Sequence, residues 1–312
     1  LEFRRVLFRS AGASTTLTLA TSGTYDGATT VSAGTLSVTH GSALGSVDGG
    51  TTVADGATLA ISNDITLAEP ITINGAGASS NGAIRSTSGA NTISGLVTLA
   101  SASEVQADAD SLTFNVASGN SFTGTYGLTF DAASGVTVTV ADPIATSTAG
   151  VTKSGAGSLT LSAVNTYTGT TTISAGTFTV SGSGSLNSGS YAGQIVNSAA
   201  FVYASSASQT LSGAISGTGN ITKNTSDSST LTLSANNSYS GNTTVSNGVL
   251  AISHGSALGT TAGTTSVATD ATLSLSGGIT VAEPFYLAGD GVKVSALDVG
   301  AIRNTSGNNT LT

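Results

Sequence analysis

Three stretches of the chain follow one 15-residue frame. They read SGTYDGATTVSAGTL (22–36), VNTYTGTTTISAGTF (164–178) and NNSYSGNTTVSNGVL (236–250). Each has a Tyr, a Gly, two or three Thr, an aliphatic residue and a second Gly in the same order. The shared positions are Tyr25, Gly27, Gly34, Tyr167, Gly169, Gly176, Tyr239, Gly241 and Gly248. Repetition of this kind favours an architecture of stacked units over a domain with a single unique core.

The repetition continues beyond the frame. HGSALG at 40–45 returns at 254–259, and GAIRSTSGANT at 82–92 returns as GAIRNTSGNNT at 300–310 after a short insertion. The middle copy matches only the first part of the others and then diverges. We therefore expect one continuous array over residues 11–312, with modules that begin near residues 17, 151 and 221.

Within each copy the apolar residues alternate with Thr, Ser or Ala, as in VTVTV (136–140) and TTISAGTFTV (171–180). This period of two is typical of short strands with one buried face, and Gly, Asn, Asp and Ser separate the segments as turn residues. The helical spacing of apolar residues is missing. About three such strands fit into roughly 20–25 residues, which is enough for one turn of a parallel β-solenoid. The sequence thus predicts an all-β solenoid of roughly a dozen coils.

A single coil of this size buries too little apolar surface to offset the conformational entropy of its backbone. Stacked neighbours must supply the rest, so each coil acts as the template for the next. The frame is repeated because the inward residues and the turn glycines are the constrained positions. We expect inward side chains at Leu17, Leu19, Val31, Leu36, Val38, Leu159, Leu161, Ile173, Phe178 and Val180.

Composition restricts the class of protein. Only 8% of the residues are charged, the formal net charge is −8, and Cys is absent. An α/β enzyme needs far more charge to cover its helices, and a chain this acidic is a poor ligand for nucleic acid. Residues 1–10 (LEFRRVLFRS) resemble a translated sequencing adapter, so we treat them as a non-native leader. Without an initiator Met or a signal peptide, we expect the chain to be a fragment.

The lead-ins VTKSGAGSLTLS (151–162) and ITKNTSDSSTLTLS (221–234), each followed by the frame, resemble the passenger-associated repeat of bacterial autotransporters, also called the autotransporter-associated β-strand repeat. The first copy departs from that pattern, because Ser22-Gly23-Thr24 stand where Asn is usual. The resemblance implies a right-handed parallel β-helix exported across the outer membrane of a diderm bacterium. It also implies a location at the cell surface or outside the cell. The implied partner is an outer-membrane β-barrel translocator in cis, outside this fragment.

We accordingly predict a non-catalytic passenger, stalk-like or adhesin-like, whose repeats template coil-by-coil folding during type V secretion. Neither a cofactor nor a metal is expected, and no catalytic residue. A surface glycan or a protein is the kind of ligand such a passenger would bind, and nucleic acid is not. Because the chain stops inside a strand-like segment at 308–312, we also expect open strands and end-to-end self-association.

The side chains that could carry chemistry have structural interpretations. His40 and His254 occupy the same slot of HGSALG and are interpreted as turn residues at a coil corner. Glu69 and Glu283 each precede a Pro, which suggests a turn at the start of a strand. Equivalent residues in the first and third copies lie many coils apart, too far to act as a catalytic pair. The Tyr of each frame fits a coil corner packed on its Thr neighbours, although an aromatic ring there could also stack a sugar.

Glu104, Asp108 and Asp110 form the densest acidic cluster (EVQADAD). We interpret it as a solvated strand edge or turn, and binding of a cation stays open. Two alternatives to a passenger remain. A carbohydrate-active β-helix enzyme, a lyase or hydrolase, would need Asp, Lys and Arg clustered on neighbouring coils. An ice-binding solenoid would need a flat TxT face in register, whereas the TTV and TLT segments do not keep one fixed period.

Overall fold

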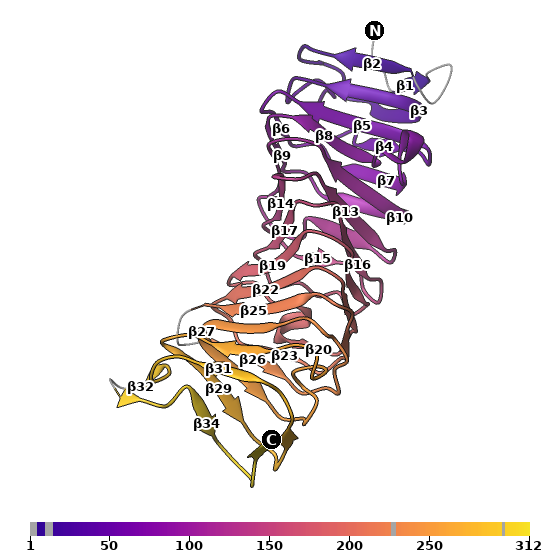
Figure 1. Cartoon of the computed structure of the whole chain (residues 1–312). Helices are drawn as coiled ribbons and strands as arrows, with labels where there is room; N and C mark the ends of the chain where they lie inside the picture. Colours follow the sequence, from indigo (N-terminus) through magenta and orange to yellow (C-terminus); the bar gives the residue numbers. More distant parts are fainter. Residues whose placement is uncertain (1–4, 10–14, 226–228, 295–296) are drawn as a thin grey trace. The chain divides into compact units, whose positions relative to one another are not determined.

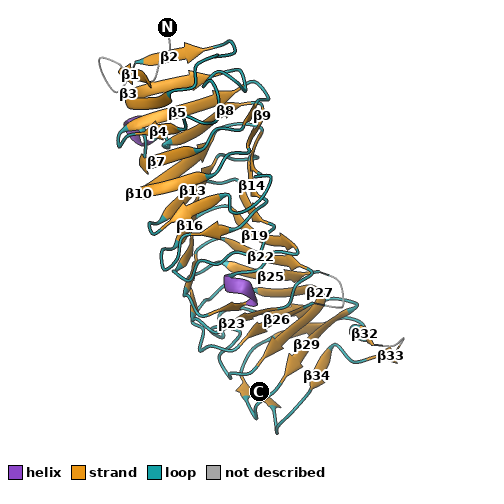
Figure 2. Ribbon diagram, turned by 180° about the vertical axis from the view of Figure 1, so that it is seen from behind, coloured by secondary structure: helices purple, strands orange, loops and turns teal. Residues whose placement is uncertain are grey.

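The computed structural model of the chain describes residues 5–9, 15–225, 229–294 and 297–312. In this part of the chain nearly every regular element is a strand, and helix is limited to two short 3-10 turns, η1 (Ala78–Ser80) and η2 (Asn187–Gly189) (Figure 2). The residues form two compact units, Leu1–Thr160 and Leu161–Thr312. Each unit is a parallel β-solenoid, with about 12 turns in all, as the sequence predicted.

In the first unit each full turn contributes one strand to each of three faces (Figure 1). The long strands β3 (Ala28–Val38) and β10 (Val97–Ala107) bend from the first face to the second. The first ladder also holds β1 (Arg5–Arg9), β4 (Thr51–Val53), β7 (Ile71–Gly75), β12 (Phe122–Gly124) and β15 (Ile144–Ala145). The second also holds β2 (Thr16–Leu19), β5 (Ala57–Ser62), β8 (Ile84–Ser88), β13 (Leu128–Ala132) and β16 (Val151–Ser154). The third holds β6 (Thr66–Leu67), β9 (Ala90–Ile93), β11 (Ser111–Phe114) and β14 (Thr137–Val140), and β17 (Ser158–Leu161) follows β16.

Inward side chains on successive turns stand in register. On the second face Leu36 pairs with Leu59, Leu59 with Ile84, and the column continues through Val105 and Phe130. All five are buried. The first face has its own column, which runs through Val31, Val53, Ile73 and Leu99. The core of the unit is therefore a set of parallel apolar columns, one residue deep per turn, as expected for a solenoid.

The prediction of inward residues is confirmed for eight of the ten positions, from Val31 to Val180, which are all buried. The other two residues lie in the same columns but are not covered, since Leu17 is 45% exposed and Leu19 is half-buried. Both align with buried partners, Leu36 and Val38. Their strand β2, however, pairs with β3 alone among the described strands, so no second turn covers them.

The second unit repeats this plan. One ladder holds β18 (Thr171–Ile173), β21 (Ile195–Asn197) and β24 (Ile215–Ser216). A second holds β19 (Thr177–Gly182), β22 (Ala200–Ser205), β25 (Asn220–Asn224), the first half of β27 (Thr243–Ile252), β28 (Thr265–Val267) and β31 (Phe285–Leu287). A third holds β20 (Ser190–Tyr191), β23 (Gln209–Leu211), β26 (Thr230–Leu233), the second half of β27, β29 (Ala271–Leu275) and β34 (Ile302–Asn304). A last pair joins β30 (Thr280–Val281) and β35 (Thr310–Leu311).

One antiparallel pair departs from the expected all-parallel pattern. It joins β32 (Lys293–Val294) and β33 (Leu297–Asp298), and β32 lies to the side of the β29–β34 ladder in Figure 1. The pair falls in the insertion that distinguishes the third copy from the first. The base of the loop is the same in both copies, because Thr272 bonds Val292 N and Gly300 O just as Thr58 bonds Ala78 N and Gly82 O. The extra residues therefore extend from a closed base and leave the parallel ladders intact.

Replacement of Leu59 by Ala tests the role of the inward columns. Leu59 is fully buried between Leu36 and Ile84. The loss of its buried methyl groups, together with the cavity left behind, should lower the free energy of unfolding by roughly 2–5 kcal/mol. Urea unfolding followed by circular dichroism measures the change. The control, Leu17→Ala at an exposed position of the same face, should cost less than about 1 kcal/mol; equal costs would contradict the column model.

Candidate functional site at the repeat corners

The Tyr of each frame lies at a corner of the solenoid and bonds a Thr four residues later. The hydroxyl oxygens of Tyr25, Tyr167 and Tyr239 lie 2.9, 3.0 and 2.7 Å from the Oγ1 atoms of Thr29, Thr171 and Thr243. Tyr167 and Tyr239 are fully buried and Tyr25 is half-buried. Burial raises the pKa of all three phenols. The rings of Tyr167 and Tyr239 are thus unavailable for stacking a sugar.

The network continues on the next turns into a buried carboxyl group. Thr29 aligns with Thr51, whose Oγ1 donates to Glu69 Oε1 at 3.0 Å. In the third copy Thr243 aligns with Thr265, whose Oγ1 donates to Glu283 Oε1 at 2.7 Å.

Each glutamate does stand just before a strand, β7 or β31, but it is 3% or 6% exposed. Burial raises the pKa of Glu69 to about 6, and it also raises the pKa of Glu283. The hydroxyl donor opposes the shift in both cases but does not cancel it.

In the middle module the frame Thr has a different hydrogen-bond partner. Thr171 Oγ1 lies 2.8 Å from the hydroxyl of Tyr191, which also donates to the carbonyl of Gly169. The rings of Tyr167 and Tyr191 meet edge to face, with centroids 5.8 Å apart. On the next turn Ile195 aligns with Thr171, so the middle module has no hydroxyl at the position of Thr51 and Thr265 and no glutamate bonded to it.

The second glycine of each frame meets a backbone requirement. Gly34, Gly176 and Gly248 have φ values of 71°, 68° and 78°, a region that L side chains rarely adopt. Gly241 serves a different need, since a Cβ there would lie 2.1 Å from the carbonyl oxygen of Gly219 on the preceding turn.

The Asn of the frame also holds two turns together, a role that the sequence did not assign. Asn165 is fully buried, and its Nδ2 donates to the carbonyls of Ala163 and Ser185. Asn237 donates to Ala257 O and accepts a hydrogen bond from Ile215 N. The spacing of Asn two residues before each Tyr was the available signal. The first copy has Gly23 at this position.

Two lysines of the lead-ins are fully buried, which the sequence did not predict. Lys153 aligns with Phe130 in the inward column, and its ammonium donates to the carbonyls of Ser154 and Gly155. Burial lowers the pKa of Lys153 to about 8, although nearby Asp131 opposes the shift. Lys223 donates to Ser229 Oγ at 3.0 Å and to backbone carbonyls. The ammonium groups of both lysines are thus hydrogen-bonded to neutral oxygens inside the solenoid.

The acidic cluster is dispersed in the structure. Asp108 forms an ion pair with Arg85 at 2.6 Å and accepts from Gln106. Asp110 accepts from Gly89 N in a turn, and Glu104 lies half-buried on β10, which ends before both aspartates. Burial, and secondarily Asp131, raises the pKa of Glu104. Within the described ranges no group of three or more His, Cys, Asp or Glu side chains could hold a metal ion.

The two histidines lie in equivalent turns. His40 Nδ1 accepts from Ser42 N at 3.1 Å, and His254 Nδ1 accepts from Ser256 N at 3.0 Å. Neither is bonded to a carboxylate or to a hydroxyl nucleophile in these contacts. Each ring therefore serves as a local acceptor that closes a turn.

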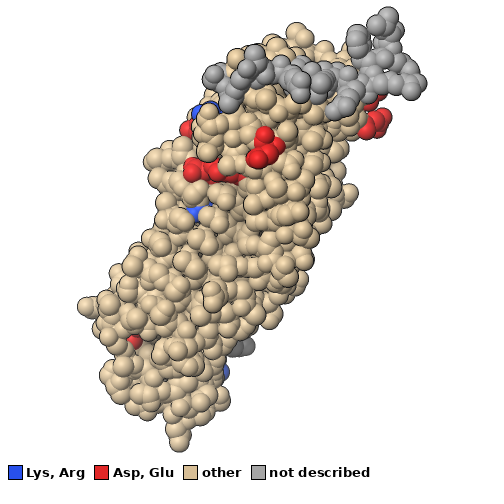
Figure 3. All heavy atoms as spheres, turned by 90° about the vertical axis from the view of Figure 1, so that its right-hand side faces the viewer, with Lys and Arg blue, Asp and Glu red and all other residues tan. Residues whose placement is uncertain are grey.

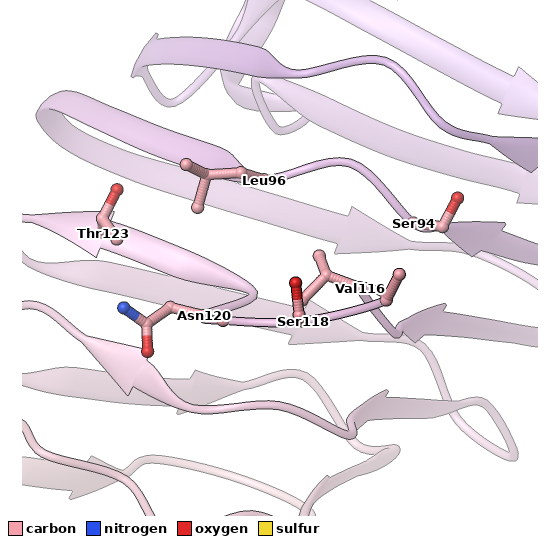
Figure 4. Close-up of a pocket in the computed structure, with 8 residues that line it drawn as sticks. Ser94, Leu96, Val116, Ser118, Asn120 and Thr123 are labelled. Atoms are coloured by element: carbon pink, nitrogen blue, oxygen red, sulfur yellow. The ribbon is translucent and has the colours of Figure 1, made fainter.

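A surface groove of about 440 Å³ opens on the first unit between the loop at 94–96 and the loop at 116–120 (Figure 4). Leu96 and Val116 form its apolar part, and Ser94, Ser118, Asn120 and Thr123 supply neutral polar groups. It has no titratable side chain. The face in Figure 3 likewise shows charged residues only in small, separate groups. Neither the groove nor this face gathers acid–base groups for catalysis.

The three frames coincide with a known repeat. The family model described as passenger-associated-transport-repeat matches residues 14–38, 151–180 and 226–252. The chain carries passenger-associated transport repeats. This confirms the resemblance to autotransporter passengers, and the repeat family implies an extracellular or surface location.

The Tyr–Thr pairs of all three modules lie inside these matched segments. Neither the curated proteins nor the solved structures gave a match to the chain. In the part of the chain that the structure describes, no helix has the length and apolar character of a membrane span.

Replacement of Tyr239 by Phe tests the corner network. The variant keeps the buried ring and removes the hydroxyl that bonds Thr243, which leaves a buried Thr oxygen without that partner. We expect the free energy of unfolding to fall by about 1–3 kcal/mol in urea titrations. Tyr126→Phe is the matched control, because Tyr126 is 45% exposed. If both variants matched the wild type, the hydrogen bond would contribute nothing measurable.

Proposed function

We propose that the chain is a non-catalytic passenger of a type V secretion autotransporter, a stalk-like or adhesin-like structure on the surface of a diderm bacterium. The observation that carries the proposal is the three passenger-associated repeats built into in-register parallel turns. An outer-membrane translocator in cis is the proposed partner. A surface glycan or a protein is the proposed class of ligand.

The register of the turns supports coil-by-coil folding during export. Each completed turn presents an edge of backbone N–H and C=O groups and an open inward column to the next segment. Leu287, at the column position next to Val267, is 51% exposed because β31 pairs only with β28 among the described strands. The arrival of another strand would bury this side chain. Folding outside the membrane would therefore favour outward movement without a nucleotide.

End-to-end self-association remains part of this proposal. The open edge of β31, with Tyr286 65% exposed and Leu287 beside it, offers unpaired backbone groups together with apolar surface. A strand from a second copy could pair with this edge.

The outward threonines of the first face bear on the alternative of an ice-binding solenoid, because they are aligned more regularly than the sequence suggested. On the first face they align on five successive turns, and the Oγ1 atoms of Thr98 and Thr123 lie 3.5 Å apart. The column consists of Thr30, Thr52, Thr72, Thr98 and Thr123. An ice-binding TxT face would need a second Thr two residues along each strand. Four of the five turns have Ser32, Ala54, Asn74 and Ala100 there, and Thr125 stands there on the fifth, so the second column that an ice-binding surface needs is missing and a passenger is better supported.

Export efficiency tests the proposed role. The chain, placed between a signal peptide and an autotransporter translocator, is expected to reach the cell surface as a protease-resistant passenger. Leu250→Ala removes part of a buried column and should lower the surface-exposed fraction several-fold, with more chain held in the periplasm. Val47→Ala, at a 49% exposed position, is the control. Equal export of both variants would argue against folding-driven movement.

A second expected outcome is the absence of catalysis. The purified chain should not cleave pectin, alginate or other polysaccharides, because Asp108 is paired with Arg85 and Asp110 is used in a turn. Product release is measured by reducing-end and unsaturated-sugar assays. Cleavage that disappears in Asp108→Ala or Asp110→Ala would support the carbohydrate-active enzyme instead.

A further inference from the structure

Each unit of the solenoid encloses one glutamate that has no cationic partner. Glu69 is 3% exposed and Glu283 is 6% exposed. Both follow Ala and precede Pro, in corresponding places of the first and third copies. Among the described residues, the ion pair that is formed joins Arg85 and Asp108 and involves neither glutamate.

The surroundings of the two glutamates are neutral. Glu69 accepts from the Thr51 hydroxyl on the preceding turn, and the titratable group that faces it is Tyr25. On the following turn the backbone of Glu69 packs against Gly95, where a Cβ would lie 1.9 Å from the Glu69 carbonyl oxygen. Glu283 accepts from Thr265, and the titratable group that faces it is Tyr239. Neither phenol carries a positive charge in any state.

An ionised carboxylate is unfavourable in these buried, neutral surroundings, because a single neutral hydroxyl replaces only part of the hydration that the carboxylate loses. The protonated carboxyl group has no such penalty and can still accept the Thr hydrogen bond. The folded turn should therefore hold the neutral acid, whereas the unfolded chain leaves the group free to ionise in water.

We infer that this chain takes up protons at Glu69 and Glu283 when it folds, so that mildly acidic surroundings strengthen both units of the solenoid and neutral surroundings weaken them. The inference concerns the chain itself and does not rest on the proposed export function. The middle module contains no glutamate, so it has no such proton site.

The direction of the effect follows from linkage. Burial raises the pKa of Glu69 from 4.5 to about 6, so in this window the folded state binds more protons than the unfolded state. The stabilisation is complete below pH 4.5 and is lost as the pH rises through about 6. For Glu69 alone this shift corresponds to a change of about 30-fold in the folding equilibrium constant. The contribution of Glu283 has the same sign.

The test compares urea unfolding of the full chain with that of the double variant Glu69→Gln/Glu283→Gln between about pH 4.5 and 7.5. Glutamine keeps the size and an acceptor oxygen but does not titrate. We expect the stability of the wild type, relative to the double variant, to fall by about 15-fold in the folding constant across this range from Glu69 alone, and by more with the contribution of Glu283. Other titrations, including that of Glu104, are common to both proteins and cancel in the difference. Asp26→Asn, which removes an exposed carboxylate, should follow the wild type.

A direct measurement keeps the inference open to refutation if the double variant does not fold. The chain has four glutamates, so carbon-13 labelling of their carboxyl groups gives few resonances to follow by NMR. In the folded wild type the resonances of Glu69 and Glu283, assigned with the single Gln variants, should titrate above the ordinary glutamate pKa of about 4.3. Ordinary titration of both groups would overturn the inference. A pH dependence of stability that is unchanged by the double substitution would overturn it as well.

Discussion

In-register pairing of successive turns is the constraint on which the structure depends. A strand such as β5 has hydrogen-bonding partners on both sides only because β3 and β8 hold the same face in the neighbouring turns. The same register places Leu59 between Leu36 and Ile84. Where a neighbouring turn is missing from the described ladders, as at β2 and β31, leucines of these columns are exposed. The same neighbouring turn thus supplies both the backbone hydrogen bonds and the apolar contacts of a strand.

At the corners of the solenoid, polar side chains are buried in hydrogen-bonded pairs. Tyr25, Thr29, Thr51 and Glu69 form two hydrogen-bonded pairs on aligned turns, and Tyr239, Thr243, Thr265 and Glu283 repeat the arrangement. In the middle module the frame Thr171 bonds Tyr191, and no glutamate is present. The conformation of the corner is therefore retained while its chemistry changes. The difference matters because a carboxyl group responds to pH near neutrality and a phenol does not.

The internal repeats predicted the stacked parallel turns, and the alternation of apolar and small polar residues predicted most inward positions, because that period depends only on the strand itself. Features that depend on neighbouring turns were harder. Glu69 was interpreted as a turn residue at the start of a strand, and the neighbouring turns that bury it could not be seen in the sequence. Lys153 and Lys223 follow Thr in ordinary strands, and their burial depends on which loop carbonyls lie beside them. The column of outward threonines could not be seen in the sequence because successive turns differ in length. The turn from Thr51 to its partner Ile71, for example, has fewer residues than the turn from Ile71 to its partner Val97.

The repeats and the stacked turns together support a passenger whose sequence is organised around folding. Hydrogen exchange with mass spectrometry on Ile84→Ala tests this account most directly, since Ile84 is buried midway along a column. If each turn is held by its neighbours, protection should fall in the turns around Leu59 and Val105 and stay unchanged in residues 171–287. A uniform loss of protection along the whole chain would show a single cooperative domain and would contradict coil-by-coil folding.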